Sequence, residues 1–121
     1  MKKILIVEDL EPLARVEEMI CSMDGYDVRV AHSGEEGLAT AAEFQPDLVL
    51  LDLVLSGDLD GEGFLAKLPN GQSGEVPKVL VVSGMVTDAL AEQLRQTPGV
   101  DVLAKPFSLP ELSRRIEALL Y

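Results

Sequence analysis

The chain has 121 residues, of which 47% are hydrophobic and 26% are charged, a composition typical of one globular domain. Twenty-one acidic and ten basic side chains give a net charge of −11, which disfavours direct binding to nucleic acid because that binding depends on lysine and arginine. No apolar run approaches the about 20 residues that span a bilayer, and the single cysteine, Cys21, excludes an internal disulfide. We therefore expect a cytoplasmic protein without membrane contact, with Cys21 packed in the core.

The first predicted strand is the apolar run Ile4–Val7, which leads into Glu8 and Asp9. The spacing of apolar residues then predicts a helix over about residues 11–23. We expect its inward face to consist of Leu13, Val16, Met19, Ile20 and Met23. On its outward face we expect Arg15, Glu17 and Glu18.

A second strand is predicted over residues 26–31, where apolar and polar side chains alternate. Because alternation indicates a strand with one solvated face, we place this strand at an edge of the sheet. Ser33 and Glu36 have the spacing of a capping box, and the helix that they open is expected to end near Pro46.

The third predicted strand, Leu48–Leu51, is a continuous aliphatic run that ends at Asp52. After a turn signal at residues 60–61, a short helix is predicted around Phe64. A surface loop rich in glycine and serine is expected over residues 69–77, directly before the next strand.

The fourth predicted strand, Val79–Val82, ends at Ser83, and a helix over about residues 87–96 follows it. The fifth predicted strand, Val100–Ala104, ends at Lys105. A second capping box, formed by serine and glutamate at positions 108 and 111, opens the last helix.

Five short strands separated by helices indicate an α/β protein with a parallel sheet. Right-handed crossovers and an edge position for the second strand favour the strand order 2-1-3-4-5. The prediction is a flavodoxin-like (βα)5 three-layer sandwich that forms one domain over residues 1–121.

The residues that follow parallel strands meet at one edge of the sheet, where such folds bind ligands. There, Glu8, Asp9 and Asp52 would repel one another unless a cation neutralises them, and Mg²⁺ prefers such oxygen ligands. Lys105 and Ser83 would hold the oxygens of a phosphoryl group. The set of residues therefore predicts Mg²⁺-dependent phosphoryl transfer to Asp52.

These residues stand in four motifs: Ile-Leu-Ile-Val-Glu8-Asp9, Leu-Val-Leu-Leu-Asp52-Leu, Val-Val-Ser83-Gly84 and Ala-Lys105-Pro106-Phe107. With them, the chain resembles over essentially its whole length a receiver domain of the bacterial two-component response-regulator family. The resemblance implies that Asp52 is the phosphoacceptor and that Ser83 and Lys105 contact the phosphoryl group. It also implies a Mg²⁺ site made of Glu8, Asp9, Asp52 and the backbone carbonyl of Val54, with Asp9 the more direct ligand of the acidic pair.

The same resemblance implies a histidine kinase or phosphotransfer protein as the phosphoryl donor and a cis bond between Lys105 and Pro106. Phosphorylation would switch the surface of the fourth helix, fifth strand and fifth helix toward a downstream target or output domain that the sequence does not name. A phosphorylation-dependent homodimer is a further option. The domain would not be an enzyme in its own right, apart from weak self-dephosphorylation.

The chain departs from the family at two places. Ser56 stands where the family usually has proline, and the Asp-Gly turn at residues 60–61 falls one residue late. Val102 stands where the family commonly has tyrosine or phenylalanine, so an aromatic rotamer switch cannot operate there.

Two other functions stay open on the sequence alone. One is a Mg²⁺-dependent phosphohydrolase with Asp52 as nucleophile, although Val54 occupies the place where such an enzyme would have its general acid. The other is a receiver-like interaction module that works without phosphorylation. The sequence also leaves open whether the chain acts alone or as part of a longer protein.

Overall fold

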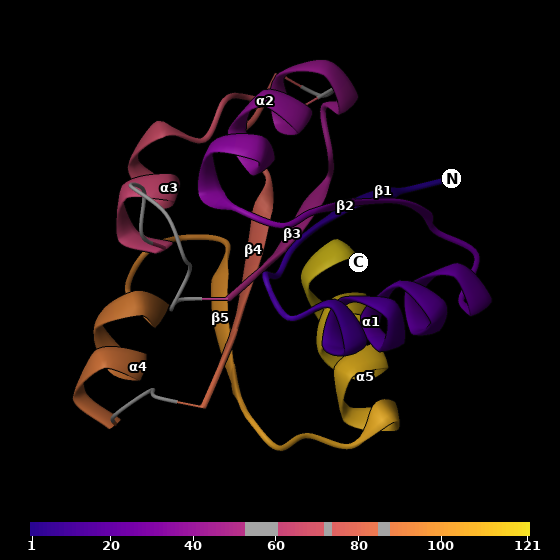
Figure 1. The fold of residues 1–121 in the computed structure, drawn as a ribbon. Helices are drawn as coiled ribbons and strands as arrows, with labels where there is room; N and C mark the ends of the chain where they lie inside the picture. Colours follow the sequence, from indigo (N-terminus) through magenta and orange to yellow (C-terminus); the bar gives the residue numbers. More distant parts are fainter. Residues whose placement is uncertain (53–60, 72–73, 85–87) are drawn as a thin grey trace.

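The computed structural model describes residues 1–52, 61–71, 74–84 and 88–121 (Figure 1). In chain order the described elements are β1 (Lys3–Val7), α1 (Glu11–Met23), β2 (Asp27–Ala31), α2 (Gly34–Phe44), β3 (Leu48–Leu51), α3 (Gly61–Lys67), β4 (Lys78–Ser83), α4 (Asp88–Arg95), β5 (Val100–Ala104) and α5 (Leu109–Leu120). The strands form one parallel sheet in the order β2-β1-β3-β4-β5, with β2 at an edge. The predicted α/β flavodoxin-like fold and strand order are confirmed.

The sheet lies between two helical layers, with α1 and α5 on one face and α2, α3 and α4 on the other (Figure 1). Side chains along β1 alternate between the two resulting cores because successive residues of a strand point to opposite faces. Leu5 and Val7 pack with residues of α2, α3 and α4, whereas Ile4 and Ile6 pack with residues of α1 and α5. This double burial explains why the inner strands read as continuous aliphatic runs.

The serines of both predicted capping boxes cap the starts of helices. The Ser33 side chain accepts a hydrogen bond from the Glu36 N–H at the start of α2, and Ser108 accepts one from the Glu111 N–H at the start of α5. Each bond satisfies a backbone donor that the first turn of a helix cannot pair internally. These contacts fix where two of the helices begin.

The predicted inward face of α1 is wrong in part. Glu17, which the apolar spacing places outside, is only 2% exposed, while Met19 and Met23, which it places inside, are 51% and 79% exposed. Ile20 is buried as predicted, and Cys21 is fully buried as expected of a core thiol. Burial raises the pKa of the Cys21 thiol to about 12.

The reason for the rotated face lies in tertiary packing. Apolar residues of α1 occur on more than one side of the helix, so its contacts with β1, β2 and α5 decide which side turns inward. The exposed Met19 and Met23 lie at a hollow that Leu109 and Pro110 of α5 also line. A spacing rule that counts apolar residues cannot separate this surface stripe from the core.

Gly37 of α2 lies close against the sheet and α3. A Cβ atom at this position would lie 2.9 Å from side-chain carbons of both Phe64 and Val7. Gly37 therefore lets α2 and α3 pack onto the end of β1 without a gap.

Among the described helices, none is long and apolar enough to cross a bilayer.

Candidate functional site

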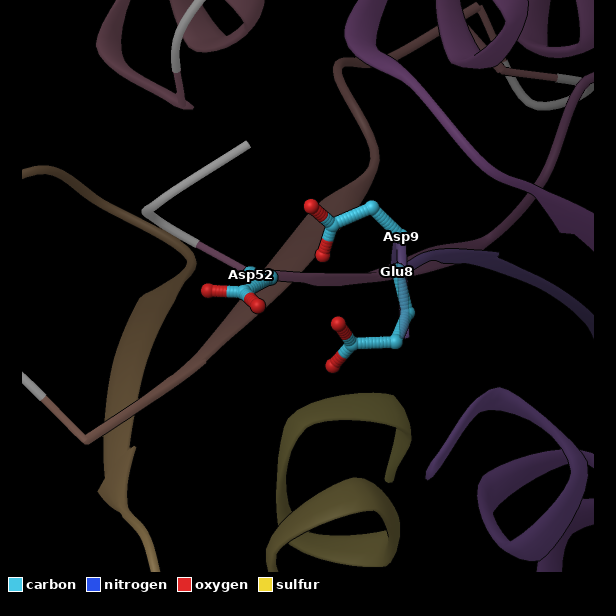
Figure 2. A group of neighbouring side chains, drawn as sticks. All are labelled: Glu8, Asp9 and Asp52. Carbon is cyan, nitrogen blue, oxygen red and sulfur yellow. The ribbon is translucent and has the colours of Figure 1, made fainter. Parts of the chain in front are cut away.

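Three carboxylates converge at the carboxyl ends of the neighbouring strands β1 and β3 (Figure 2). Val7 and Leu51 are paired across β1 and β3, and the Asp52 N–H donates to the Val7 carbonyl at 3.1 Å, so Glu8 and Asp52 follow side by side. With Asp9, these residues offer carboxylate oxygens that all lie within 4.8 Å of one another. We call Glu8, Asp9 and Asp52 the carboxylate cluster.

Lys105 reaches this cluster from the end of β5. Its Nζ lies 3.2 Å from Glu8 Oε1 and 3.3 Å from Asp52 Oδ2. Its backbone N–H donates to the Ser83 carbonyl at 3.1 Å, which ties the end of β5 to the end of β4. The Lys105–Pro106 bond is cis, as predicted.

Two of the three carboxylates are buried, Asp9 is half-buried, and few positive charges lie beside them. Glu8 is 2% exposed and Asp52 is 7% exposed, and Lys105 is the only basic side chain that the described part of the chain pairs with them. Burial, and then the neighbouring Asp52 carboxyl, raises the pKa of Glu8 to about 7. Although burial disfavours the ammonium, the charges of Glu8 and Asp52 raise the pKa of Lys105.

The donor set fits a hard divalent cation. Carboxylate oxygens are the ligands that Mg²⁺ prefers, and these three carboxylates have only the Lys105 ammonium as a basic partner among the described residues. Glu8, Asp9 and Asp52 are thus together as the sequence predicts. Val54, whose carbonyl is the fourth expected ligand, lies outside the described residues, as does Ser56.

Ser83 lies at the same edge of the sheet. It is the last residue of β4, it is 1% exposed, and it stands beside Ala104 in the β4–β5 register. Its carbonyl accepts a hydrogen bond from the backbone N–H of Lys105, so the two residues expected at a phosphoryl group lie at neighbouring strand ends.

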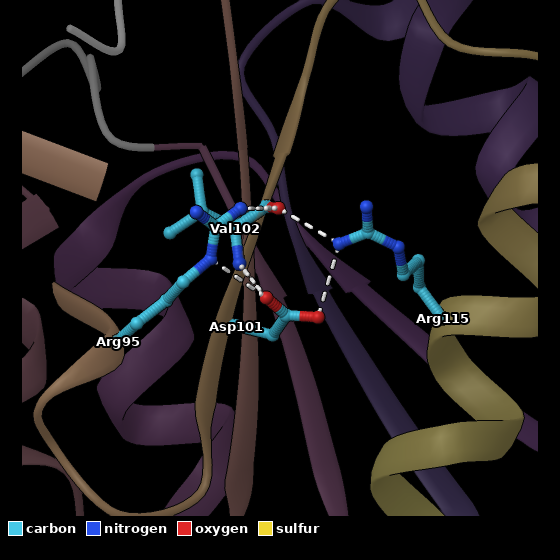
Figure 3. A network of polar contacts seen from close by, with 4 residues as sticks. All are labelled: Arg95, Asp101, Val102 and Arg115. Atoms are coloured by element: carbon cyan, nitrogen blue, oxygen red, sulfur yellow. Dashed lines mark hydrogen bonds and ion pairs between the residues drawn. The ribbon is translucent and has the colours of Figure 1, made fainter. Parts of the chain in front are cut away.

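A second charged group, which the sequence analysis missed, lies on the α4, β5 and α5 side (Figure 3). Arg95 Nε lies 3.2 Å from Asp101 Oδ1, and Arg115 Nη1 lies 3.0 Å from Asp101 Oδ2. Both guanidinium groups also donate to the Val102 carbonyl at 3.1 Å, and the Val102 N–H donates to Asp101 Oδ1 at 2.8 Å. We call Arg95, Asp101 and Arg115 the arginine network.

Asp101 is held in its ionised form by these contacts. Burial works in the opposite direction, but the bonds from the Val102 N–H and the two arginines hold the pKa of Asp101 below its usual value. In the sequence, the only signal was an acidic residue in the middle of an otherwise apolar strand. The backbone of Val102, at the expected aromatic position, is thereby tied to both α4 and α5.

Comparison with known families matches residues 4–117 to the response regulator receiver domain. Among curated relatives, the chain is 38% identical to the transcriptional regulatory protein YkoG of Bacillus subtilis, over 97% of this chain and 50% of YkoG. It is 33% identical to the DNA-binding dual master transcriptional regulator RpaA of Synechocystis, over 99% of this chain and 49% of RpaA. The chain spans about half the length of these relatives.

The fold is also that of a solved receiver structure. A CheY-like response regulator receiver domain protein from Methanospirillum hungatei superposes with a TM-score of 0.84 at 28% identity. The match covers 99% of this chain and 94% of that one.

Proposed function

The chain belongs to the response regulator receiver domain family, and from this premise we propose that Asp52 is the residue that accepts the phosphoryl group. Receiver domains are phosphoacceptor signalling modules of two-component systems rather than classical enzymes. The observation that carries the assignment to Asp52 is its place between the Glu8 and Asp9 carboxylates and the Lys105 ammonium.

In the proposed reaction, an Asp52 carboxylate oxygen attacks the phosphorus of a phosphohistidine on a partner kinase or phosphotransfer protein. The O–P bond forms as the P–N bond breaks, and the histidine nitrogen leaves with the electron pair and takes up a proton. Lys105 lies close enough to Asp52 to offset charge on the phosphoryl oxygens. Ser83, at the end of the neighbouring strand, is the proposed second contact to those oxygens.

We propose Mg²⁺ as the cofactor, held by Glu8, Asp9, Asp52 and the backbone carbonyl of Val54, the last of which lies outside the described residues. The bound ion would supply positive charge that offsets the repulsion between the carboxylates and the incoming phosphoryl oxygens. Within the chain itself, Glu8 keeps Lys105 in place by its 3.2 Å ion pair.

We propose that phosphorylation changes the rest of the domain through the ends of β4 and β5. Phosphorylation would draw Ser83 and the following loop inward and shift an equilibrium at the surface of α4, β5 and α5. Because Val102 is not aromatic, the change cannot use a ring rotation at that position. The proposed partners of this surface are a downstream target or output domain, or a second copy of the chain.

We further propose that residues 1–121 form one receiver domain that works in the cytoplasm with a histidine kinase partner. With a net charge of −11, we propose that this domain does not bind nucleic acid itself.

Intact-mass measurement tests the proposal. The parent chain, incubated with acetyl phosphate and Mg²⁺, is expected to gain one phosphoryl group, and Asp52→Asn is expected to gain none. Asp27→Asn, which changes an exposed aspartate on β2, is the matched control and should behave like the parent.

Two results would contradict the proposal. A parent chain that stays unmodified under these conditions would favour an interaction module independent of phosphorylation. Phosphorylation of Asp52→Asn to the parent level would place the acceptor elsewhere, and steady turnover of a generic phosphomonoester would favour the phosphohydrolase.

A further inference from the structure

Glu17 is a buried acid that the proposed phosphoryl transfer does not use. It lies on the inward face of α1 beside Ala14, Ile20 and Cys21, and it is 2% exposed. Its Oε1 atom is buried and has no hydrogen-bond partner within the part of the chain that the structure describes. An ionised carboxylate in such a place is strongly disfavoured, so the neutral, protonated form is the one that fits this site.

The surroundings of Glu17 connect it to the carboxylate cluster. Figure 2 shows the Glu8 carboxylate directed toward the face of the sheet that carries α1 and α5. Glu8 also accepts a hydrogen bond from the Leu10 N–H at the start of α1, at 3.3 Å. Helix α1 packs against β1, the strand that leads into Glu8.

The charged groups that act on Glu17 come from three strand ends. Burial, and then the charge of Glu8, raises the pKa of Glu17 to about 8; the Lys105 ammonium acts in the opposite direction, and Asp52 raises the pKa further. The Cys21 thiol, on α1 itself, is the remaining titratable neighbour, and its pKa is in turn raised by Glu17. Among the described residues, β2 and α5 contribute no titratable group to this set.

We propose that Glu17 is a proton-carrying positioning residue that couples cation binding at the carboxylate cluster to the release of a proton from helix α1. The inference rests on the proposed function at one point, namely that the cluster binds a divalent cation. Before the cation binds, Glu17 is protonated and neutral, so it adds no negative charge to those of Glu8 and Asp52. A cation at the cluster makes an ionised Glu17 less unfavourable, so the proton leaves to solvent.

The coupling works equally in the other direction. By linkage, if cation binding favours loss of the proton from Glu17, then loss of that proton raises the affinity for the cation by the same factor. For each proton released, the affinity gains up to about tenfold per pH unit. Glu8 itself can release a proton when a cation binds, so the contribution of Glu17 appears as the difference between the parent and a variant without that proton.

Calorimetric titration with Mg²⁺ at a pH just below 8, repeated in two buffers of different ionisation enthalpy, counts the protons released per ion. We expect the parent to release more protons than Glu17→Gln, by up to one per ion, and to show a steeper rise of Mg²⁺ affinity with pH. Glu18→Gln removes the same charge from the exposed side of the same helix, and it should match the parent.

Glu17→Leu is the second variant, because its apolar side chain of similar size suits the buried site even if glutamine does not fold there. It should show the proton count and the pH slope of Glu17→Gln. A purely structural Glu17 would change stability but leave both quantities as in the parent.

The outcomes separate the two proposals. Equal proton counts and equal slopes in the parent and both Glu17 variants, with Mg²⁺ binding intact, would overturn the role of Glu17 alone. A parent chain that binds no Mg²⁺ would overturn the metal site and the Glu17 role together.

Discussion

The carboxylate cluster and the arginine network have opposite charge balances. In the cluster, three carboxylates share one ammonium; in the network, one carboxylate lies between two guanidinium groups. Burial, and then the neighbouring Asp52 carboxyl, raises the pKa of Glu8 to about 7, whereas the bonds from the Val102 N–H and the two arginines lower the pKa of Asp101 against the effect of burial. The cluster is therefore the candidate for ligand binding, while the network joins α4, β5 and α5.

The largest expected effect concerns pH. In a chelator, the unfolded chain releases the Glu8 proton near pH 4.5 and the folded chain keeps it to about pH 7, so the free energy of unfolding should fall across this interval by up to about 3 kcal/mol. Glu8→Gln should make this fall smaller, and the fall that remains is the contribution of Glu17, whose pKa is also raised, to about 8. Denaturant unfolding at a series of pH values measures both.

Asp101 should have the opposite pH dependence. Its stabilisation is present above the ordinary value of 3.8 and is lost as the pH falls through its lower folded value. An Asp101→Asn variant should therefore lose less stability than the parent on strong acidification. If both variants change the same limb of the curve, the contrast between the two charged groups is wrong.

The next effect is the response to Mg²⁺. At a hundredfold excess over its dissociation constant, the ion should stabilise the parent by about 2.7 kcal/mol. Asp101→Asn should keep this response, because the arginine network does not contribute to the cluster. Thermal melts with and without Mg²⁺ measure this response. A parent chain with the same melting temperature in both conditions would argue against the metal site.

Removing the central carboxylate of the network should cost about 2 kcal/mol of stability, because Asp101→Asn weakens charge-assisted bonds to both arginines and leaves them facing each other. Asp27→Asn, an exposed change of the same kind, should stay within about 0.5 kcal/mol of the parent. Equal stability of the two variants in denaturant unfolding would show that the network contributes little.

The smallest effect has the opposite sign. Asp9→Asn removes one of three mutually repelling charges, so metal-free stability should rise by about 1 kcal/mol. The same change should weaken the Mg²⁺ response. A variant that is less stable than the parent in chelator would mean that Asp9 has a favourable partner that outweighs the repulsion.

The sequence predicted what depends on local order along the chain. Aliphatic runs that end in Glu8-Asp9, Asp52, Ser83 and Lys105 give the strands, and parallel strands bring their ends together whatever lies between. The carboxylate cluster and its contact with Lys105 were therefore predictable, as were the two serine N-caps. Each of these features needs only a short stretch of sequence and a general rule of parallel sheets.

What the sequence could not predict depends on packing between distant elements. Arg95, Asp101 and Arg115 come from three different elements, and no spacing rule joins them. Glu17 was placed outside because glutamate is rarely buried and because Met19 and Met23 offered an apolar stripe on the other side of α1. Only the contacts of α1 with the sheet and α5 reveal which side is inside.

The close approach at Gly37 has a consequence for how freely this domain can vary. In a saturation library, most exposed helix positions should accept many residues, but position 37 should accept almost none, because even a methyl group would press on Val7 and Phe64. Val7 directly precedes Glu8. A variant at position 37 that still folds could therefore carry displaced Glu8 and Asp9 side chains. Position 37 is thus a point where selection for signalling should be stricter than selection for abundance.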